Sequence, residues 1–431
     1  MLDIELFRNN LEKIIESEKN RFKDPTNAEK VLEYDIKWRD VLGELQELRR
    51  KRNEISQSIG ELKKEGKDEE AEEAIEESVQ LKEKIETLET EADELLKKRE
   101  EKRYIVGNVL HKSVPIAETE EDNKIIRDVG KIKDLSFDPV SHVDLIEIIG
   151  GADTKKASRI AGSRFYYLKN DIAKLNLALM NFSLDILEEK GFTPMWTPFF
   201  VKHEVIKAAA ELADFEEQLY KIEDEDLYMI ATSEQTLAAY HYDEILDPDE
   251  LPLKYAGISS CFRREAGSHG KDTLGIFRVH QFEKIEQYIF CKPENSWEYH
   301  EELISNAEEI YKQLNIPYRV VSIASGDLND NAAKKYDLEA WFPASQTYRE
   351  LVSCSNCTDY QARKLKIRMG KVGIQEEKET PHTLNSTAIA TERTICCLIE
   401  NFQNEDHSIT IPKKLRKYMN GKKLISPVVK K

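Results

Sequence analysis

The feature that most constrains this chain is a long proline-free stretch with coiled-coil spacing. No proline occurs from Thr26 to Val114, and apolar residues recur there at alternating intervals of three and four. That spacing is typical of helices that pack along one seam. The positions are Trp38, Val41, Leu45, Leu48, Ile55, Ile59 and Leu62, then Ser78, Leu81, Ile85, Leu88, Ala92 and Leu95.

The seam is interrupted once, at the sequence Lys-Glu-Gly-Lys-Asp of residues 64–68. A break of this kind lets the chain turn back, so the pattern predicts an antiparallel helical hairpin over about residues 26–103. Arms of roughly 27 residues would be ~40 Å long at 1.5 Å per residue. The heptads alone do not distinguish a projecting arm from a generic dimerisation coil.

Charge is unevenly distributed along the chain. The net charge of −18 argues weakly against a nucleic-acid partner, because phosphate binding needs Lys and Arg. However, Arg49, Arg50, Lys51 and Arg52 form a basic cluster, and residues 412–431 carry eight basic residues and no acid. Residues 68–77 hold seven acids. Local basic surfaces can therefore exist on an acidic protein, although each run alone is equally typical of a solvated face.

No apolar run approaches the ~18–20 residues of a membrane span, and the N-terminus lacks a targeting pattern, so we expect a cytoplasmic protein with no membrane partner. Its six cysteines are then expected to be reduced. Cys354 and Cys357 have the spacing of a zinc half-site, but no second well-spaced pair completes it. Zinc is therefore not expected.

The remaining sequence predicts an α+β fold. Hairpin-like strands with few intervening helices favour an antiparallel β-sheet flanked by helices. Prolines in the β-rich run 192–201 imply an edge position for it. The expected domains are 1–105, a connector over 106–165 and a main domain over 166–431. The expected helices are 1–20, 143–149, 171–190 and 391–402, and the expected strands are 275–282, 285–290, 318–322 and 348–353.

The densest set of functional candidates lies in CFRREAGSHGKDTLGIFRVHQFEKIEQ, residues 261–287. Two strand-like segments flank a polar loop, and the spacing of Arg278, Phe282 and Glu286 places them on one face of a strand. An arginine, an aromatic ring and a carboxylate can bind a phosphate, stack on a base and hold an ammonium group. The alternative is a solvated polar face.

Three shorter stretches add to this set. Glu350 and Ser353 could offer hard oxygen ligands to Mg²⁺. In residues 382–403, small residues precede a helix whose first turn holds Arg393, a position suited to a terminal phosphate. The hydroxyls and carboxylate of residues 231–235 could recognise a small polar substrate. The sequence contains neither a P-loop nor a strand-linked G-x-G-x-x-G, so any ATP site must be built from a different motif.

Together these stretches resemble the class II aminoacyl-tRNA synthetases and, among them, the seryl-tRNA synthetase family, along nearly the whole chain. Residues 191–201 resemble motif 1, the dimer-interface element. Residues 261–287 and 382–403 resemble motifs 2 and 3, and the helical hairpin resembles the family's tRNA-binding arm. The Ser-Thr-Ala-Ile-Ala form of motif 3 (residues 386–390) is similar to that of the common zinc-free type in archaea and eukaryotes.

The resemblance implies a class II catalytic domain, with roles for particular residues. It implies catalytic roles for Arg263, Arg278 and Arg393, and Mg²⁺ ligation by Glu350 and Ser353. The implied ATP contacts are Arg263, Arg264, Glu265, Arg278, Val279, Phe282, Glu350, Leu351, Val352, Ser353 and Arg393. The implied serine contacts are Thr232, Ser233, Glu234, Arg263, Glu286, Asn385 and Thr387. The implied tRNA contacts are Arg49, Arg50, Lys51, Arg52, His269 and Lys271.

The implied reaction is activation of serine by ATP, followed by transfer to tRNA(Ser); whether tRNA(Sec) is also charged stays open. The implied assembly is a homodimer that binds tRNA across its subunits. One departure from the family is Glu392, an acid that would compete for Arg393. Two alternative hypotheses are open. A paralogue that acylates a carrier protein would lack the helical arm, and a non-catalytic scaffold protein would have lost Arg263, Arg278 and Arg393. A class I synthetase is disfavoured because its signature sequences are absent.

Overall fold

The computed structural model describes residues 1–209, 218–266, 273–371, 373 and 378–428. The chain forms two compact units, Met1–Val109 and Leu110–Lys431, and each is described by itself. None of the helices in these described ranges is long and apolar enough to cross a membrane.

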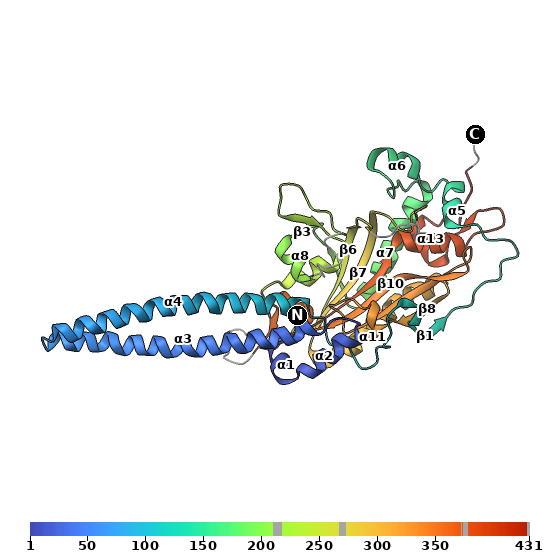
Figure 1. Cartoon of the computed structure of the whole chain (residues 1–431). Helices are drawn as coiled ribbons and strands as arrows, with labels where there is room; N and C mark the ends of the chain where they lie inside the picture. The colour runs from blue at the N-terminus through green and yellow to red at the C-terminus, as the bar shows by residue number, and fades with distance from the viewer. Residues whose placement is uncertain (210–217, 267–272, 372, 374–377, 429–431) are drawn as a thin grey trace. The chain divides into compact units, whose positions relative to one another are not determined.

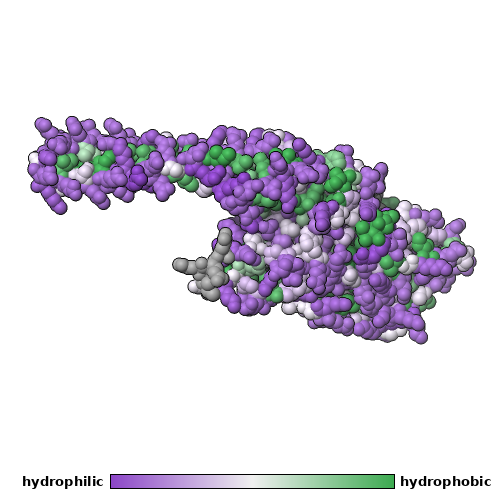
Figure 2. Space-filling view, turned by 90° about the horizontal axis from the view of Figure 1, so that it is seen from below, coloured by the Kyte–Doolittle hydropathy of each residue, from purple (hydrophilic) through white to green (hydrophobic). Residues whose placement is uncertain are grey.

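The first unit contains the expected helical hairpin. Helix α3 spans Thr26–Lys64 and helix α4 spans Asp68–Ile105, and the two run side by side from a turn at residues 65–67 (Figure 1). The seam is confirmed: Leu45, Ile85, Leu88 and Ala92 form a buried cluster. Figure 2 shows this hydrophobic seam between the charged side chains of the hairpin.

The helices are longer than expected, at 39 and 38 residues, or about 58 Å at 1.5 Å per residue. The half-buried residues Ile55, Ile59 and Leu62 continue the seam towards the turn. Charged residues with good helix propensity fill the other positions. Asp68, Glu69 and Glu70 occupy the first turn of α4, where negative charge is favourable.

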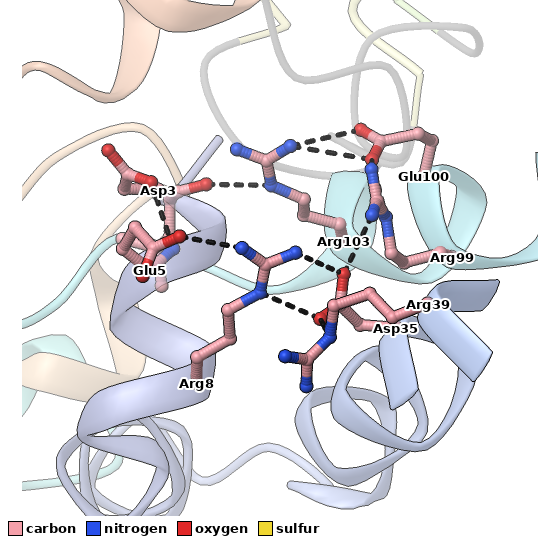
Figure 3. A network of polar contacts seen from close by, with 9 residues as sticks. Asp3, Glu5, Arg8, Asp35, Arg39, Arg99, Glu100 and Arg103 are labelled. Carbon is pink, nitrogen blue, oxygen red and sulfur yellow. Dashed lines mark hydrogen bonds and ion pairs between the residues drawn. The ribbon is translucent and has the colours of Figure 1, made fainter. Parts of the chain in front are cut away.

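The open end of the hairpin holds a charged network that the heptad pattern did not predict (Figure 3). Instead of one helix over residues 1–20 there are two, α1 (Ile4–Asn9) and α2 (Leu11–Asn20). Asp35 is fully buried and accepts hydrogen bonds of 2.7–2.9 Å from Arg8 and Arg99, with Arg39 at 3.2 Å. Burial alone would raise the pKa of Asp35, but Arg8 and Arg99 outweigh it and lower the pKa. This network fixes α1 to both arms.

The second unit is built on an eight-stranded sheet with the order β1-β8-β9-β10-β12-β7-β6-β2. All neighbours are antiparallel except β2 and β6, so the sheet is mixed. Strand β2 lies at one edge and contains Pro194, as the prolines predicted. In sheet order the strands are Lys124–Val129, Tyr318–Ser322, Lys334–Phe342, Thr347–Thr358, His382–Ala390, Gln281–Cys291, Leu253–Phe262 and Thr193–Trp196.

Helices α7 (Asn170–Glu189), α11 (Ser296–Leu314) and α13 (Thr391–Asn401) pack with the sheet in the main apolar core. Gly191, with φ of +82°, follows α7 and lets Phe192 turn back onto it. The other helices are α5 (His142–Ile148), α6 (Thr154–Ala161), α8 (His203–Ala209), α10 (Glu234–Ala238) and α12 (Tyr360–Lys364). The short strands are β3 (Phe200–Lys202), β4 (Leu227–Met229), β5 (Ile245–Leu246), β11 (Arg368–Met369), β13 (Ile409–Thr410) and β14 (Leu424–Ile425).

Three expectations about local structure need correction. Residues 106–165 are more than a connector, because β1 joins the main sheet through β8 and residues from 110 onward belong to the second unit. The strands expected at 275–282 and 285–290 are a single strand, β7, which begins at Gln281. Arg278 therefore precedes the strand, and the period-two argument applies to Phe282 and Glu286 only.

Cys354 and Cys357 lie on β10 with their side chains on opposite faces of the sheet. The thiol of Cys354 contacts the carbonyl of His300 in α11, whereas that of Cys357 contacts the side-chain amide of Asn385 in β12. Residues three apart on a strand point to opposite sides, so this pair cannot chelate one ion.

Candidate active site

A cavity of about 130 Å³ opens over strands β7, β10 and β12. It is lined by Thr232, Glu234, Arg263, Phe282, Lys284, Glu286, Glu350, Leu351, Ser353, Asn385, Thr387, Ala390 and Arg393. All of these except Lys284 and Ala390 are candidates from the sequence, although they come from four separate stretches. The sheet topology therefore brings the four stretches to one site.

Strand pairing explains how these side chains meet. Phe282, Lys284 and Glu286 alternate along β7 and share a face. Thr387 of β12 lies directly opposite Glu286. The missed residue Lys284 could have been found from the sequence, because it lies midway between the other two at the same period.

The loop at residues 231–233, which leads into α10, approaches β6 closely at Gly257. A Cβ atom at this glycine would lie 2.7 Å from Cδ1 of Leu237 and 2.9 Å from Oγ of Ser233. The hydroxyl of Ser233 donates to the Gly257 carbonyl at 3.4 Å and is fully buried, so Ser233 supports the loop and does not line the cavity. Thr232 and Glu234, on either side of it, do line the cavity.

One end of the cavity holds two carboxylates in different electrostatic settings, of which Glu286 is buried and Glu234 is half-buried. Glu286 is ion-paired with Lys284, and Thr387 Oγ1 donates to it at 3.5 Å. Among the residues that the structure describes, two amides donate to Glu234: Gln361 Nε2 at 3.2 Å and Asn385 Nδ2 at 3.1 Å. Burial, and then the nearby charge of Glu286, raise the pKa of Glu234 to about 7. Burial also raises the pKa of Glu286.

The other end of the cavity carries the arginines. The Arg263 guanidinium lies 5.2 Å from the ring centroid of Phe282, and its Nε donates to the Ala231 carbonyl. Arg393 Nη1 contacts Glu350 Oε2 at 3.3 Å, and Arg278 Nη1 contacts Glu265 Oε2 at 3.2 Å. Val279 is buried and lines a small adjoining hollow with Glu265, Arg278 and Phe282.

Other candidates lie away from this cavity. Val352 is buried in the apolar core, and Arg264 is exposed, with its backbone N–H bonded to the Gln218 carbonyl. His269 and Lys271 lie outside the described residues. In the hairpin, Arg49, Arg50 and Lys51 have carboxylate partners on the same surface, at 2.6, 3.6 and 2.7 Å respectively. Arg52, next to them, is half-buried.

The expectation that Glu392 competes for Arg393 is wrong. Glu392 is 1% exposed and accepts hydrogen bonds from Tyr166 Oη at 2.7 Å, the Glu283 backbone N–H at 2.9 Å and Thr391 Oγ1 at 3.0 Å. Residues 392 and 393 point in different directions because they are adjacent on helix α13. Burial, and then the interaction with the Glu283 side chain, raise the pKa of Glu392 well above its usual range.

The oxygen donors at the β10 side of the cavity fit a hard cation that also binds phosphates. Glu350 and Ser353 line the cavity, and Asp337 of β9 pairs directly with Ser353 across the strands. One oxygen of Asp337, Oδ1, is buried and finds no hydrogen-bond partner among the described residues. Within the described residues, no group of three or more His, Cys, Asp and Glu side chains has metal-binding geometry. A Mg²⁺ ion here would therefore need oxygens from a substrate as well.

Comparison with known proteins agrees with this geometry. Residues 219–402 match the core domain of class II tRNA synthetases for Gly, His, Pro, Ser and Thr, and residues 1–110 match the N-terminal domain of seryl-tRNA synthetases. The fold and site thus define a class II aminoacyl-tRNA synthetase. The serine–tRNA ligase of Methanosphaera stadtmanae is 57% identical over 425 residues, covering 99% of each chain. The chain belongs to the seryl-tRNA synthetase family.

Solved structures support the same assignment. The seryl-tRNA synthetase of Pyrococcus horikoshii complexed with ATP has a TM-score of 0.95 and 47% identity, with full coverage of both chains. The cytoplasmic serine–tRNA ligase of Naegleria fowleri in complex with AMP has a TM-score of 0.91 and 44% identity, covering 100% of this chain and 99% of that one.

Proposed function

We propose that this protein activates L-serine with ATP and then attaches the serine to tRNA. The observation that carries the proposal is that one cavity is lined by two carboxylates, Glu234 and Glu286, and by two arginines, Arg263 and Arg393. The carboxylates suit a small amino acid, and the arginines suit a triphosphate.

The partners of the two carboxylates indicate which part of serine each one contacts. Glu286 is already neutralised by Lys284, so we assign it, with Thr387, to the uncharged serine hydroxyl. The donors to Glu234 in the described ranges are amides, so its ionised form is assigned to the substrate ammonium. A pocket that bonds the hydroxyl should reject alanine by about 10⁴-fold, because its buried partners would go unpaired. Threonine must be excluded by the extra volume of its methyl group.

For the nucleotide we assign the adenine to the ring of Phe282 and to Glu265, and the α-phosphate to Arg263. Arg278 and Arg393 are assigned to the outer phosphates, for which they would exchange their present carboxylate partners. Glu350 and Ser353 are the proposed Mg²⁺ ligands. The ion would neutralise charge on the phosphates when bound.

The chemistry needs no nucleophilic side chain. A carboxylate oxygen of serine attacks the α-phosphorus, and the bond to the departing pyrophosphate breaks, which gives seryl-adenylate. A hydroxyl of the terminal tRNA adenosine then attacks the seryl carbonyl and releases AMP. The protein contributes orientation and stabilisation of developing charge, which are the terms that dominate such reactions.

The hairpin is the proposed tRNA-binding element, with Arg49 to Arg52 contacting phosphates. Residues 26–105 contain 24 acidic and 17 basic residues, so contact must be local. Exposed ion pairs such as Arg49–Glu89 are weak, and an RNA phosphate can displace the carboxylate. His269 and Lys271 are proposed to contact the acceptor end. Charging of tRNA(Sec) and a cytoplasmic location stay predictions.

A homodimer is proposed to form through the edge strand β2. Trp196 at its end is 73% exposed, and Leu177 on α7 is 60% exposed. A strand edge that carries a large exposed apolar side chain such as Trp196 is a surface that proteins normally cover. Binding of one tRNA across both subunits follows from the family resemblance.

The direct test is ATP–pyrophosphate exchange with each of the twenty amino acids, followed by charging of purified tRNA. Exchange with serine alone, and charging of tRNA(Ser), are the expected results. Serine exchange without tRNA charging would favour the carrier-protein paralogue, and no exchange with any amino acid would favour the scaffold. The hairpin already weighs against that paralogue.

A further inference from the structure

Asp337 is a buried acid that the sequence patterns did not indicate. It lies on β9 between two neighbouring strands, opposite Val321 of β8 and opposite Ser353 of β10. Side chains directly opposite each other on antiparallel strands lie on the same face, with Cβ atoms about 4.5–5.5 Å apart. Asp337 therefore lies on the cavity face, beside a proposed Mg²⁺ ligand.

The carboxylate of Asp337 is incompletely satisfied. The residue is 7% exposed, and its Oδ1 has no hydrogen-bond partner in the described part of the chain. Its nearest cation is Lys335, whose Nζ lies 3.7 Å from Oδ2, which is beyond hydrogen-bonding distance. A buried carboxylate oxygen without a partner is costly, so a native protein normally supplies it with a donor, a water molecule or an ion.

The surrounding charges leave room for a cation once ATP binds. Glu339, two residues away, is held by Arg319 at 2.5 Å. Glu350 is held by Arg393, the residue assigned to the triphosphate. When the triphosphate takes that guanidinium, Glu350 loses this ion pair, whereas Lys335 stays near both Glu350 and Asp337. Two carboxylates, a hydroxyl and phosphate oxygens are a donor set that suits Mg²⁺.

We propose that Asp337 is a third protein ligand of the divalent cation that Glu350 and Ser353 hold with ATP, through its Oδ1 directly or through one metal-bound water. The inference rests on the proposed Mg²⁺ site. It adds a metal ligand from β9 to the two ligands that the family resemblance implies on β10.

The test is binding of Mn²⁺, a spectroscopic substitute for Mg²⁺, to the full-length enzyme with α,β-methylene-ATP, followed by electron paramagnetic resonance. Asp337→Asn keeps the shape but removes the charge and should raise the Mn²⁺ dissociation constant at least tenfold. Glu339→Gln is the matched control, since it removes the same charge from the same strand and face. It should change the constant by less than threefold.

The outcomes separate this inference from the function on which it rests. If the wild type binds no Mn²⁺ with the nucleotide, the proposed metal site itself fails. If the wild type binds Mn²⁺ and Glu350→Gln loses it, but Asp337→Asn stays within twofold of wild type, only the role of Asp337 is overturned. If the Asp337→Asn variant does not fold, the Mn²⁺ dissociation constant is measured on Asp337→Ser instead, with the same expected increase.

Discussion

The hairpin and the active site use the same kind of charged pair in opposite ways. Arg49 and Glu89 lie on the hairpin surface, with side chains 53% and 45% exposed. Lys284 and Glu286 form their pair with side chains only 7% and 2% exposed. Water and salt screen the first pair, so it contributes little and its arginine can change partner. The second pair is shielded, and removing one member leaves a buried charge alone.

This difference suggests how one chain handles two substrates of different size. A long RNA can be held by exposed charges that exchange partners and respond to salt. A small amino acid must be recognised by groups that are fixed before it arrives.

Breaking the buried pair should have the largest effect. Lys284→Met leaves Glu286 without its cation, and we expect the serine kcat/KM in pyrophosphate exchange to fall by about 10²–10³-fold, as for loss of one partner of a buried charged pair. The double variant Lys284→Met, Glu286→Gln removes both charges and should recover part of the stability, but not the activity. A single variant within threefold of wild type would contradict the assignment.

Glu392 tests whether a buried acid positions Arg393. Its carboxylate accepts a hydrogen bond from the backbone N–H of Glu283, which follows Phe282 on strand β7. Glu392 itself lies in the first turn of helix α13, directly after strand β12. Glu392→Ala should raise the ATP KM by about tenfold, because the Glu283 backbone N–H would lose its acceptor. Glu392→Gln, which keeps an acceptor, should stay close to wild type. A lower ATP KM in the Ala variant would instead support competition for Arg393.

Serine activation should depend on pH through Glu234, whose pKa is raised to about 7 by burial and by Glu286. The proposal needs the ionised carboxylate, so the serine kcat/KM should fall about tenfold per pH unit below that value and level off above it. Steady-state exchange from pH 5.5 to 8.5 measures the profile. In Glu234→Gln the slope should disappear along with most of the activity. A wild-type profile flat down to pH 5.5 would contradict the role.

Removing exposed pairs should have the smallest effect. Arg49→Ala with Lys51→Ala should shift the midpoint of thermal unfolding by less than about 2 °C, since surface ion pairs are weak. Serine exchange should not change, whereas the tRNA KM should rise several-fold and depend less steeply on salt. Glu89→Ala with Glu77→Ala is the control, because it frees the same two cations and should not weaken tRNA binding.

Local patterns in the sequence predicted much of this structure. The heptads fixed the phase of the hairpin, and the period-two spacing of Phe282 and Glu286 placed both on one face. The same spacing failed for Arg278, which lies in the segment before β7, because side-chain spacing does not say where a strand begins. Glu350, Ser353 and Arg393 were candidates from the residues alone, and the family resemblance assigned their roles.

The residues that sequence reasoning missed depend on partners far away in the chain. In the sequence, Asp35 has the pattern of an ordinary exposed acid on a helix. In the structure it accepts hydrogen bonds from Arg8 and Arg99 at the open end of the hairpin. Asp337 acquires its setting from the pairing of β9 with β10. The direction of Glu392 depends on Tyr166 and on the Glu283 backbone. Periodicity carries no information about such contacts.

Serine activation is assigned to the catalytic unit and tRNA binding to the hairpin. The most direct measurement compares pyrophosphate exchange and tRNA charging in one shortened enzyme. Deleting residues 46–59 and 73–86 removes two heptads from each helix, keeps the seam in phase and retains the Asp35 network. Exchange with serine should stay within about twofold of wild type, while charging should fall at least 100-fold. Equal loss of both activities, or charging that survives, would contradict the account.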